Sequence, residues 1–220
     1  MGVVALTFLL AFCVTIILLI IGTPLAWWLS QTRSRLKPLI EALCAMPLIL
    51  PPTVLGFYLL IAFNPQALIG KFWMSVTGDT LSFSFAGLVI ASVIYSLPFM
   101  VQPLQSAFES IGKAPLEAAA SLRAGPLDSF RSVVLPQSRR GFLSACVLTF
   151  AHTIGEFGVV LMVGGNIPGR TKVIAIDIYE RVETLDYAGA HRLSLGLLLF
   201  SFLVLLAIYS LNRKGGYRVG

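Results

Sequence analysis

Five long apolar segments, separated by polar connections, constrain this chain more than any other feature of its sequence. They are Val3–Leu29, Leu43–Phe63, Phe85–Phe108, Phe142–Val163 and Leu193–Leu211. Each is close to the length of about 20 residues that a helix needs to cross about 30 Å of hydrocarbon. Only 12% of the residues are charged, about half the share usual in a soluble domain. Residues 1–220 are therefore predicted to form one all-α membrane domain with about five transmembrane helices.

Lysine and arginine are distributed unevenly between the connections. Alternate connections, together with the C-terminal tail, place eleven bases on one side of the membrane and five on the other. Because bases are retained on the cytoplasmic side, we expect the N-terminus outside, and the C-terminus and the loop 109–140 in the cytoplasm. Trp27 and Trp28 end the first span where an interfacial aromatic belt belongs. The first span is too long for the apolar core of a signal peptide and lacks a basic start, so we interpret it as a mature helix.

Prolines interrupt two of the spans. They are Pro47, Pro51 and Pro52 in the second span, and Pro98 and Pro103 in the third. Each removes a backbone donor and kinks a helix, and the freed carbonyls need other helices or a water-filled path. Kinked helices are also common in bundles without a path, so both interpretations stay open. Outside the spans, Ala67–Val76 is predicted as a short interfacial helix. Val173–Tyr187 is predicted as a helix across the outer mouth, with an apolar stripe of Ile174, Ile178, Val182 and Leu185.

The connection after the third span carries a helix–turn–helix pattern at about 113–136. Pro115 precedes an alanine-rich run, Gly125-Pro126 ends it, and a second short helix ends near Pro136. The segment Glu117–Pro136 resembles the Glu-Ala-Ala loop of type I ABC importer permeases, which docks on the ATPase subunit. The resemblance implies that the ATPase-coupling residues are Glu117, Ala118, Ala119, Leu122, Arg123, Ala124, Gly125, Pro126 and Leu127.

One position departs from the family pattern. The glycine of the motif falls at Arg123, and the chain has Gly125 two residues later. We expect Gly125 to take over the helix break, which would then lie at Ala124–Pro126.

A second resemblance narrows the cargo. The run Gly-Glu-Phe-Gly at 155–158, the run Asn-Ile-Pro-Gly at 166–169 and the segment Pro47–Gly56 are similar to those of molybdate and sulfate permeases, and the short chain favours the molybdate branch. The resemblance implies that the pathway or gate residues are Pro51, Pro52, Thr53, Gly155, Glu156, Phe157 and Gly158.

Glu156 is the only acid inside a predicted span, and His152 lies one turn before it. A carboxylate inside the membrane is costly and is a functional candidate, for instance in a proton-coupled site. It would, however, repel an anion in a medium of low dielectric constant. We therefore favour a structural role, with Glu156 hydrogen-bonded to backbone or to a neighbouring helix, and with Gly155 and Gly158 allowing close helix packing.

The prediction is thus a type I ABC importer permease of the bacterial inner membrane, multi-pass and working as a homodimer. Its expected cargo is molybdate, with sulfate, tungstate or a secondary transporter as alternatives. The resemblance implies a cytoplasmic ABC ATPase dimer and a periplasmic or extracellular oxyanion-binding protein as partners. The sequence has no phosphate-binding loop, so ATP is expected to be used by the partner subunit. No catalytic residue, metal site, bound cofactor or nucleic-acid partner is expected.

Overall fold

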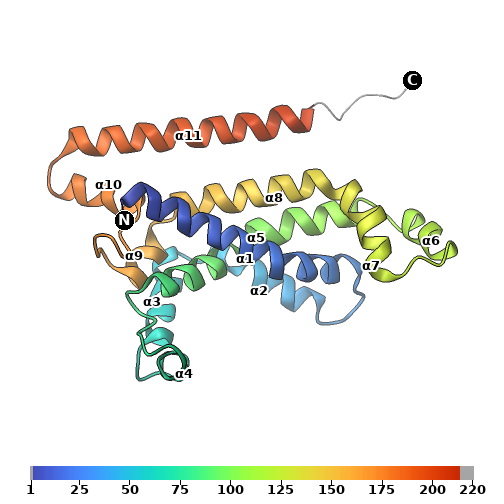
Figure 1. The fold of residues 1–220 in the computed structure, drawn as a ribbon, viewed down its shortest axis with the longest axis horizontal. Coiled ribbons are helices and arrows are strands. Elements are labelled where there is room, and N and C mark those ends of the chain that lie inside the picture. Colours follow the sequence, from blue (N-terminus) through green and yellow to red (C-terminus); the bar gives the residue numbers. More distant parts are fainter. Residues whose placement is uncertain (1, 214–220) are drawn as a thin grey trace.

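The computed structural model describes residues 2–213, and this part of the chain is helical and contains no strand (Figure 1). Three helices are long and apolar enough to cross a membrane alone: α1 (Val3–Gln31), α5 (Phe85–Glu109) and α11 (Tyr187–Arg213). Two bent pairs supply the remaining crossings, namely α2 (Lys37–Ile49) with α3 (Pro52–Phe63), and α8 (Leu135–Gly155) with α9 (Gly158–Gly164). The predicted all-α membrane fold with about five spans is confirmed.

The second and fourth spans are broken; the prolines predict a kink in the second span, and the break in the fourth is not predicted. The bend between α2 and α3 is 111°, and the bend between α8 and α9 is 60°. The first break falls at Pro51, and Pro52 then begins α3, where its missing N–H costs no hydrogen bond. In contrast, α5 continues through Pro98 and Pro103 as one helix. The adjacent Pro51 and Pro52 therefore break their helix, whereas Pro47 lies within α2 and the two prolines of the third span lie within α5.

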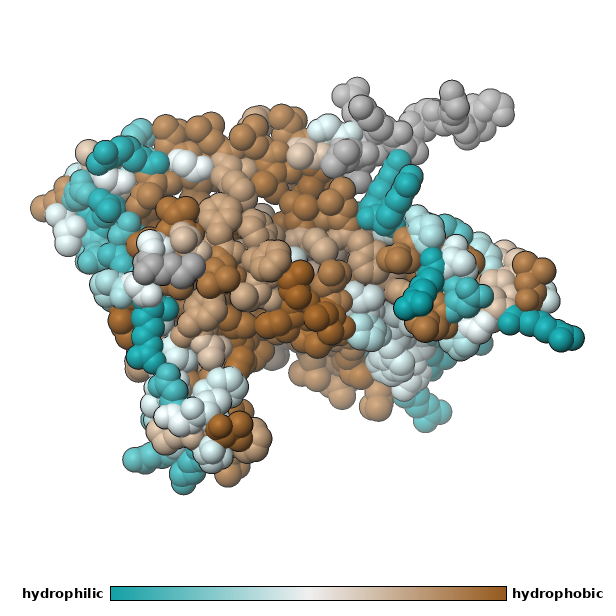
Figure 2. All heavy atoms as spheres, in the orientation of Figure 1, coloured by the Kyte–Doolittle hydropathy of each residue, from teal (hydrophilic) through white to brown (hydrophobic). Residues whose placement is uncertain are grey.

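Helices α1, α5 and α8 form the centre of the bundle. Their fully buried side chains include Leu10, Val14, Leu18, Leu88, Met100, Leu104 and Ala145. Gly22 allows α1 to approach α5 closely, since a Cβ there would lie 2.9 Å from the Cγ of Met100. Figure 2 shows an apolar band around the middle of the molecule with hydrophilic residues at its two ends. The band matches a surface that lies in hydrocarbon, and the two ends match the two membrane surfaces.

Helix α11 lies along the outside of this bundle (Figure 1). In its most apolar stretch only 6% of the residues are buried, compared with 39% in α1 and 44% in α5. Most apolar side chains of α11 are therefore not covered by the rest of the described chain.

Short helices lie at both ends of the bundle. Helices α4 (Leu68–Thr77) and α10 (Ile174–Glu183) lie at one end, close to the predicted ranges. Helices α6 (Ala114–Ser121) and α7 (Pro126–Ser129) and the π-helical turn η1 (Phe130–Val134) lie at the other. The predicted apolar stripe of α10 is only partly buried: Ile174 packs inside, whereas Val182 and Leu185 are 42% and 70% exposed.

The chain starts α1 at the α10 end, and α11 runs toward the α6 end (Figure 1). An odd number of crossings puts the two ends of the described chain on opposite sides. Lys214 and Arg218, which contribute to the predicted charge asymmetry, lie outside the described residues.

Candidate functional site

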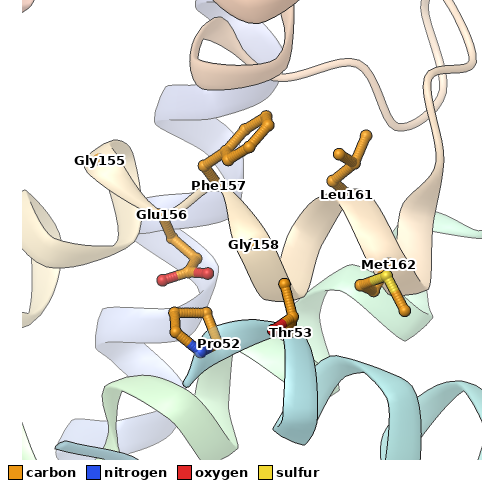
Figure 3. Close-up of a pocket in the computed structure, with 8 residues that line it drawn as sticks. All are labelled: Pro52, Thr53, Gly155, Glu156, Phe157, Gly158, Leu161 and Met162. Carbon is orange, nitrogen blue, oxygen red and sulfur yellow. The ribbon is translucent and has the colours of Figure 1, made fainter. Parts of the chain in front are cut away.

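The broken spans meet at an open cavity of about 400 Å³ (Figure 3). Its walls come from the start of α3 and from the junction between α8 and α9. The lining residues are Pro52, Thr53, Gly155, Glu156, Phe157, Gly158, Leu161 and Met162. These include six of the seven residues predicted for the pathway or gate. The seventh, Pro51, lies directly before α3 and does not line the cavity.

Glu156 organises the junction between α8 and α9. Its side chain is 6% exposed and points toward Pro52 in Figure 3. The backbone N–H of Val159 donates a hydrogen bond of 2.9 Å to Oε1 of Glu156. A carboxylate at this position satisfies a free donor of the first turn of α9 and lies at the positive end of its dipole. The expected hydrogen bond from Glu156 to backbone is present.

Small residues bring α3 and α9 into close contact beside the cavity. A Cβ on Gly158 would lie 2.6 Å from the Cβ of Pro52, and a Cβ on Gly56 would lie 2.8 Å from the Cβ of Met162. Gly155 differs, because nothing lies within 4 Å of the position of its Cβ. The prediction of close packing is therefore correct for Gly158 and wrong for Gly155.

His152 belongs to a different contact. Its Nδ1 lies 3.0 Å from Oγ of Ser96 on α5, and its ring stacks on Phe99 with a centroid distance of 3.9 Å. Within residues 2–213, no hydrogen bond joins His152 to Glu156. The two side chains are one turn apart, but each is engaged with a different partner.

At the other end of the molecule, α6 ends in a left-handed residue. Arg123 has φ +59°, the conformation that glycine adopts most readily. The N–H of Arg123 donates to the carbonyl of Ala120 at 2.9 Å, and the N–H of Ala124 donates to that of Ala119 at 3.0 Å. This pair of hydrogen bonds is a Schellman motif, which normally carries glycine at the left-handed position.

The helix break between α6 and α7 is therefore present, but it is centred on Arg123. Gly125 has φ −69° and precedes α7 in an ordinary extended conformation. The expectation that Gly125 replaces the motif glycine is wrong. Arg123 keeps the backbone geometry of that glycine at its original position.

The helix–turn–helix presents polar and apolar side chains away from the bundle. Glu117, Ala118, Arg123, Gly125 and Pro126 are exposed, and so are Leu122 at 84% and Leu127 at 63%. Ala119 is buried and Ala124 is half-buried. Leu122 and Leu127 thus add two exposed apolar side chains to a loop whose other exposed residues are polar or small.

An aromatic cluster connects this loop to the spans. Trp27 lies 5.4 Å from Phe108 and 5.8 Å from Phe130, between ring centroids. Phe142 lies 5.7 Å from Phe108. The cluster joins η1 to the ends of α1 and α5 and to α8. Trp27 is half-buried against this cluster, whereas Trp28 is 40% exposed, and both lie near the end of α1. The sequence shows aromatic residues near the ends of separate segments, but it does not show that these residues are in contact.

A charged network lies on α10 and the loop before it. Lys172 forms ion pairs with Asp177 at 3.0 Å and with Glu180, and Arg181 pairs with Asp177 at 3.1 Å. The hydrogen bond to Glu180 raises the pKa of Lys172, and the same bond lowers the pKa of Glu180. Burial opposes ionisation of Asp177, but the hydrogen bonds from Lys172 and Arg181 outweigh it and lower its pKa. The network therefore stays charged at neutral pH.

Two further contacts hold the loop between α9 and α10. The side-chain amide of Asn166 donates to Glu180 at 3.0 Å, and Arg170 pairs with Asp79 at 3.0 Å. The second contact joins this loop to the segment after α4. The Asn-Ile-Pro-Gly run is thus attached both to α10 and to the neighbouring connection.

Comparisons with known proteins place this geometry among transport proteins. The family model "Binding-protein-dependent transport system inner membrane component" matches residues 19–214. The chain is 59% identical over 210 residues to the molybdenum transport system permease protein ModB of Azotobacter vinelandii, which covers 96% of this chain and 93% of that protein. It is 37% identical over 195 residues to a protein of the same name from Mycobacterium bovis, covering 88% and 73%. It is 33% identical over 213 residues to the sulfate transport system permease protein CysT of Salmonella typhimurium, covering 97% and 76%.

Proposed function

This chain belongs to the family of binding-protein-dependent transport system inner membrane components, and we propose that it is the permease subunit of an ATP-driven importer for molybdate. The observation that carries the proposal is the similarity to the Azotobacter permease over almost the whole of both chains. Similarity to the sulfate permease is much lower. Tungstate and sulfate remain the competing cargoes, because they are also tetrahedral dianions.

A proton-coupled secondary transporter is the alternative from another class. Such a protein commonly carries paired ionisable groups near the middle of the membrane. Here His152 binds Ser96, and Glu156 caps α9. The separate engagement of the two side chains favours a structural role for Glu156, and thus supports the ATP-driven mechanism.

The proposed cytoplasmic face is the end that holds α6 and α7. The connections at this end carry most of the lysines and arginines, which supports the proposed orientation. The ATPase would then dock on the exposed side chains of the loop, with Leu122 and Leu127 as apolar anchors and Glu117 as a charged contact. Ala119 is buried and would support the loop from inside. ATP would be bound by the partner, and we propose no cofactor for this chain.

A second copy of the chain would complete the pathway. In one copy the centre between α1, α5 and α8 is filled by buried side chains, and the cavity at the broken spans is open on one side. Apolar side chains of α2 and α3, on either side of the break at Pro51, are exposed, among them Ile49 at 85%, Phe57 at 49% and Tyr58 at 65%. A homodimer with its two-fold axis near the cavities would cover these side chains and enclose a path between the copies.

The mechanism follows from what joins the loop to the spans. ATP binding by the partner would move the two coupling loops together. Because Phe130 packs on Trp27 and Phe108, a displaced loop would move the ends of α1 and α5 with it. The breaks at Pro51 and Glu156 would allow the inner and outer halves of two spans to tilt separately. The path would then open to one side at a time, as a dianion that cannot enter hydrocarbon requires.

The opposite end would receive the soluble binding protein. The network around Lys172 and Asp177 keeps α10 and its loop ordered at this surface. Since the binding protein would supply most of the affinity for the anion, the path itself needs no tight site. This fits a cavity lined mainly by apolar groups.

The test is uptake by proteoliposomes. The membrane holds the full chain with its ATPase, which faces the vesicle interior, and the binding protein is added outside together with the anion. Labelled molybdate, tungstate and sulfate are offered separately, with and without internal ATP. We expect ATP-dependent uptake of molybdate, with tungstate as a competitor and sulfate as a weak one. Preferred uptake of sulfate would reject the cargo, and uptake driven by a proton gradient without ATP would reject the transporter class.

A further inference from the structure

Two apolar hollows lie between α11 and the rest of the bundle. The first, of about 190 Å³, is lined by Val4, Phe8, Ile174, Arg192, Leu193, Gly196, Leu197 and Phe200. The second, of about 360 Å³, is lined by Thr15, Cys146, Val147, Phe150, Phe200 and Val204. Phe200 lines both, so the hollows follow one another along the same side of α11. Together they form the groove between α11 and the surface of α1 and α8, called here the α11 groove.

Aromatic contacts fix the width of the α11 groove. The ring of Phe8 lies 5.7 Å from that of Phe200 and 5.9 Å from that of Phe150, between centroids. Gly196 leaves the groove open, because nothing lies within 4 Å of the position of its Cβ. Helix α11 therefore touches the bundle at Phe200, between the two hollows, and its buried Ala190 and Ile208 mark further contacts nearer its two ends.

The dimensions decide what can occupy the groove. A helix with its side chains is about 10–12 Å wide. It does not fit beneath α11, because the rings of Phe8 and Phe200 are in contact there. A hydrocarbon chain is narrow and flexible enough to lie in both hollows, which are open on one side, and to pass around the Phe8–Phe200 contact along that open side. From Arg192 to Val204 the groove extends along α11 for about 18 Å at about 1.5 Å per residue, close to the depth of about 15 Å that one leaflet fills in a core of about 30 Å.

A positive charge stands at the outer mouth of the groove. The Nε of Arg192 donates to the carbonyl of Ala188 at 3.3 Å, and Arg192 forms no ion pair with the carboxylates of residues 2–213. The carboxylate of Asp186, which the charge of Arg192 also stabilises, is held by the N–H of Gly189 and by Arg181. The terminal nitrogens of Arg192 are thus available for a phosphate, for which the planar guanidinium is well suited.

We propose that the α11 groove is a binding site for one anionic phospholipid. Its phosphate binds Arg192, and one acyl chain lies in the two hollows beneath α11. The lipid comes from the leaflet at the α10 end and fills space that the protein leaves empty. It thereby holds α11 against α1 and α8. This site is separate from the cavity at the broken spans, and it does not depend on which anion is transported.

Native mass spectrometry of the full chain with added palmitoyl-oleoyl-phosphatidylglycerol tests the proposal. We expect one lipid per chain that survives detergent removal. Gly196→Phe, which fills the first hollow, should abolish this bound lipid. Arg192→Gln should weaken it about tenfold, as the loss of a charge-assisted hydrogen bond predicts. Arg192→Gln leaves the apolar walls of the groove unchanged, so this variant tests the site even if Gly196→Phe disturbs folding.

Two control variants separate the site from general effects. Leu198→Phe adds a similar ring on α11 at a position that is 62% exposed and outside the groove. His191→Gln changes the residue beside Arg192. Both should retain the lipid as the unaltered chain does. Equal retention by Gly196→Phe and Arg192→Gln would overturn the proposal. So would a disulfide between two copies of Gly196→Cys, because it would show that a second chain occupies the groove.

Discussion

Replacing Arg123 by glycine should stabilise the coupling loop. Arg123 is left-handed at φ +59°, which costs an L-residue about 1–2 kcal/mol. Glycine removes this strain but gives the unfolded chain freedom worth about 0.4–1 kcal/mol. The difference leaves a net gain of about 0.5–1 kcal/mol, or about two- to fivefold in the local opening equilibrium.

Hydrogen exchange of the full chain in lipid nanodiscs measures this equilibrium directly. The informative amide is that of Ala124, which donates to the carbonyl of Ala119 and closes the motif. In Arg123→Gly its exchange should slow by the factor above. Peptides from α10, at the other end of the molecule, should exchange as before.

Two matched variants identify the cause. Arg123→Ala removes the guanidinium but keeps the Cβ and its strain, so exchange should not slow. Gly125→Ala relieves no left-handed strain, since Gly125 has φ −69° and open space around its Cβ position. Any gain from it comes only from the reduced freedom of the unfolded chain, about 0.4–1 kcal/mol. If Arg123→Ala protects Ala124 as much as Arg123→Gly does, the charge and not the backbone is responsible, and the reasoning fails.

Three further predictions concern the broken spans and the outer network. Gly158→Val should separate α9 from α3, because its Cβ would lie 2.6 Å from the Cβ of Pro52, and it should abolish molybdate uptake. Gly155→Ala is the matched control: nothing lies within 4 Å of its Cβ position, so uptake should be unchanged. Glu156→Ala removes the cap of α9 and should lower stability by about 0.5–2 kcal/mol in thermal unfolding, whereas Glu156→Gln keeps an acceptor and should lose less. Acidification should loosen α10, because the pKa of Asp177 is lowered in the folded protein. The stabilisation that the Asp177 carboxylate contributes is therefore complete above its ordinary pKa of about 4. It is lost as the pH falls through the lower pKa that Asp177 has in the folded protein. Hydrogen exchange in α10 should accelerate in that range, and Lys172→Gln should flatten the dependence; an unchanged profile in this variant would contradict the ion-pair account.

The spans could be predicted from the sequence because hydropathy and length are local properties. The break at Pro51 is also visible locally, since adjacent prolines cannot continue a helix. The break at Glu156 is different, as no proline marks it. It depends on the carboxylate of Glu156, which accepts a hydrogen bond from the first turn of α9, and on Gly158, which lets α9 approach α3. The role of Gly158 could not be predicted, because α3 is far away in the sequence.

The coupling loop shows where residue preference misleads. Glycine is favoured in left-handed positions, so the sequence directs the prediction to Gly125. The hydrogen bonds from Arg123 and Ala124 fix the left-handed residue two positions earlier. The aromatic cluster around Trp27 could not be predicted either, because it joins segments that are far apart in the chain.

The central claim is that the loop at Glu117 converts ATP hydrolysis by a partner into transport through this chain. The number of molybdate ions taken up per ATP hydrolysed, in proteoliposomes holding the complete importer, tests it most directly. Glu117→Lys should lower this ratio severalfold, while Glu183→Lys, the same charge change on α10 at the opposite end, should leave it unchanged. An unaltered ratio in Glu117→Lys, with normal assembly of the complex, would contradict the account.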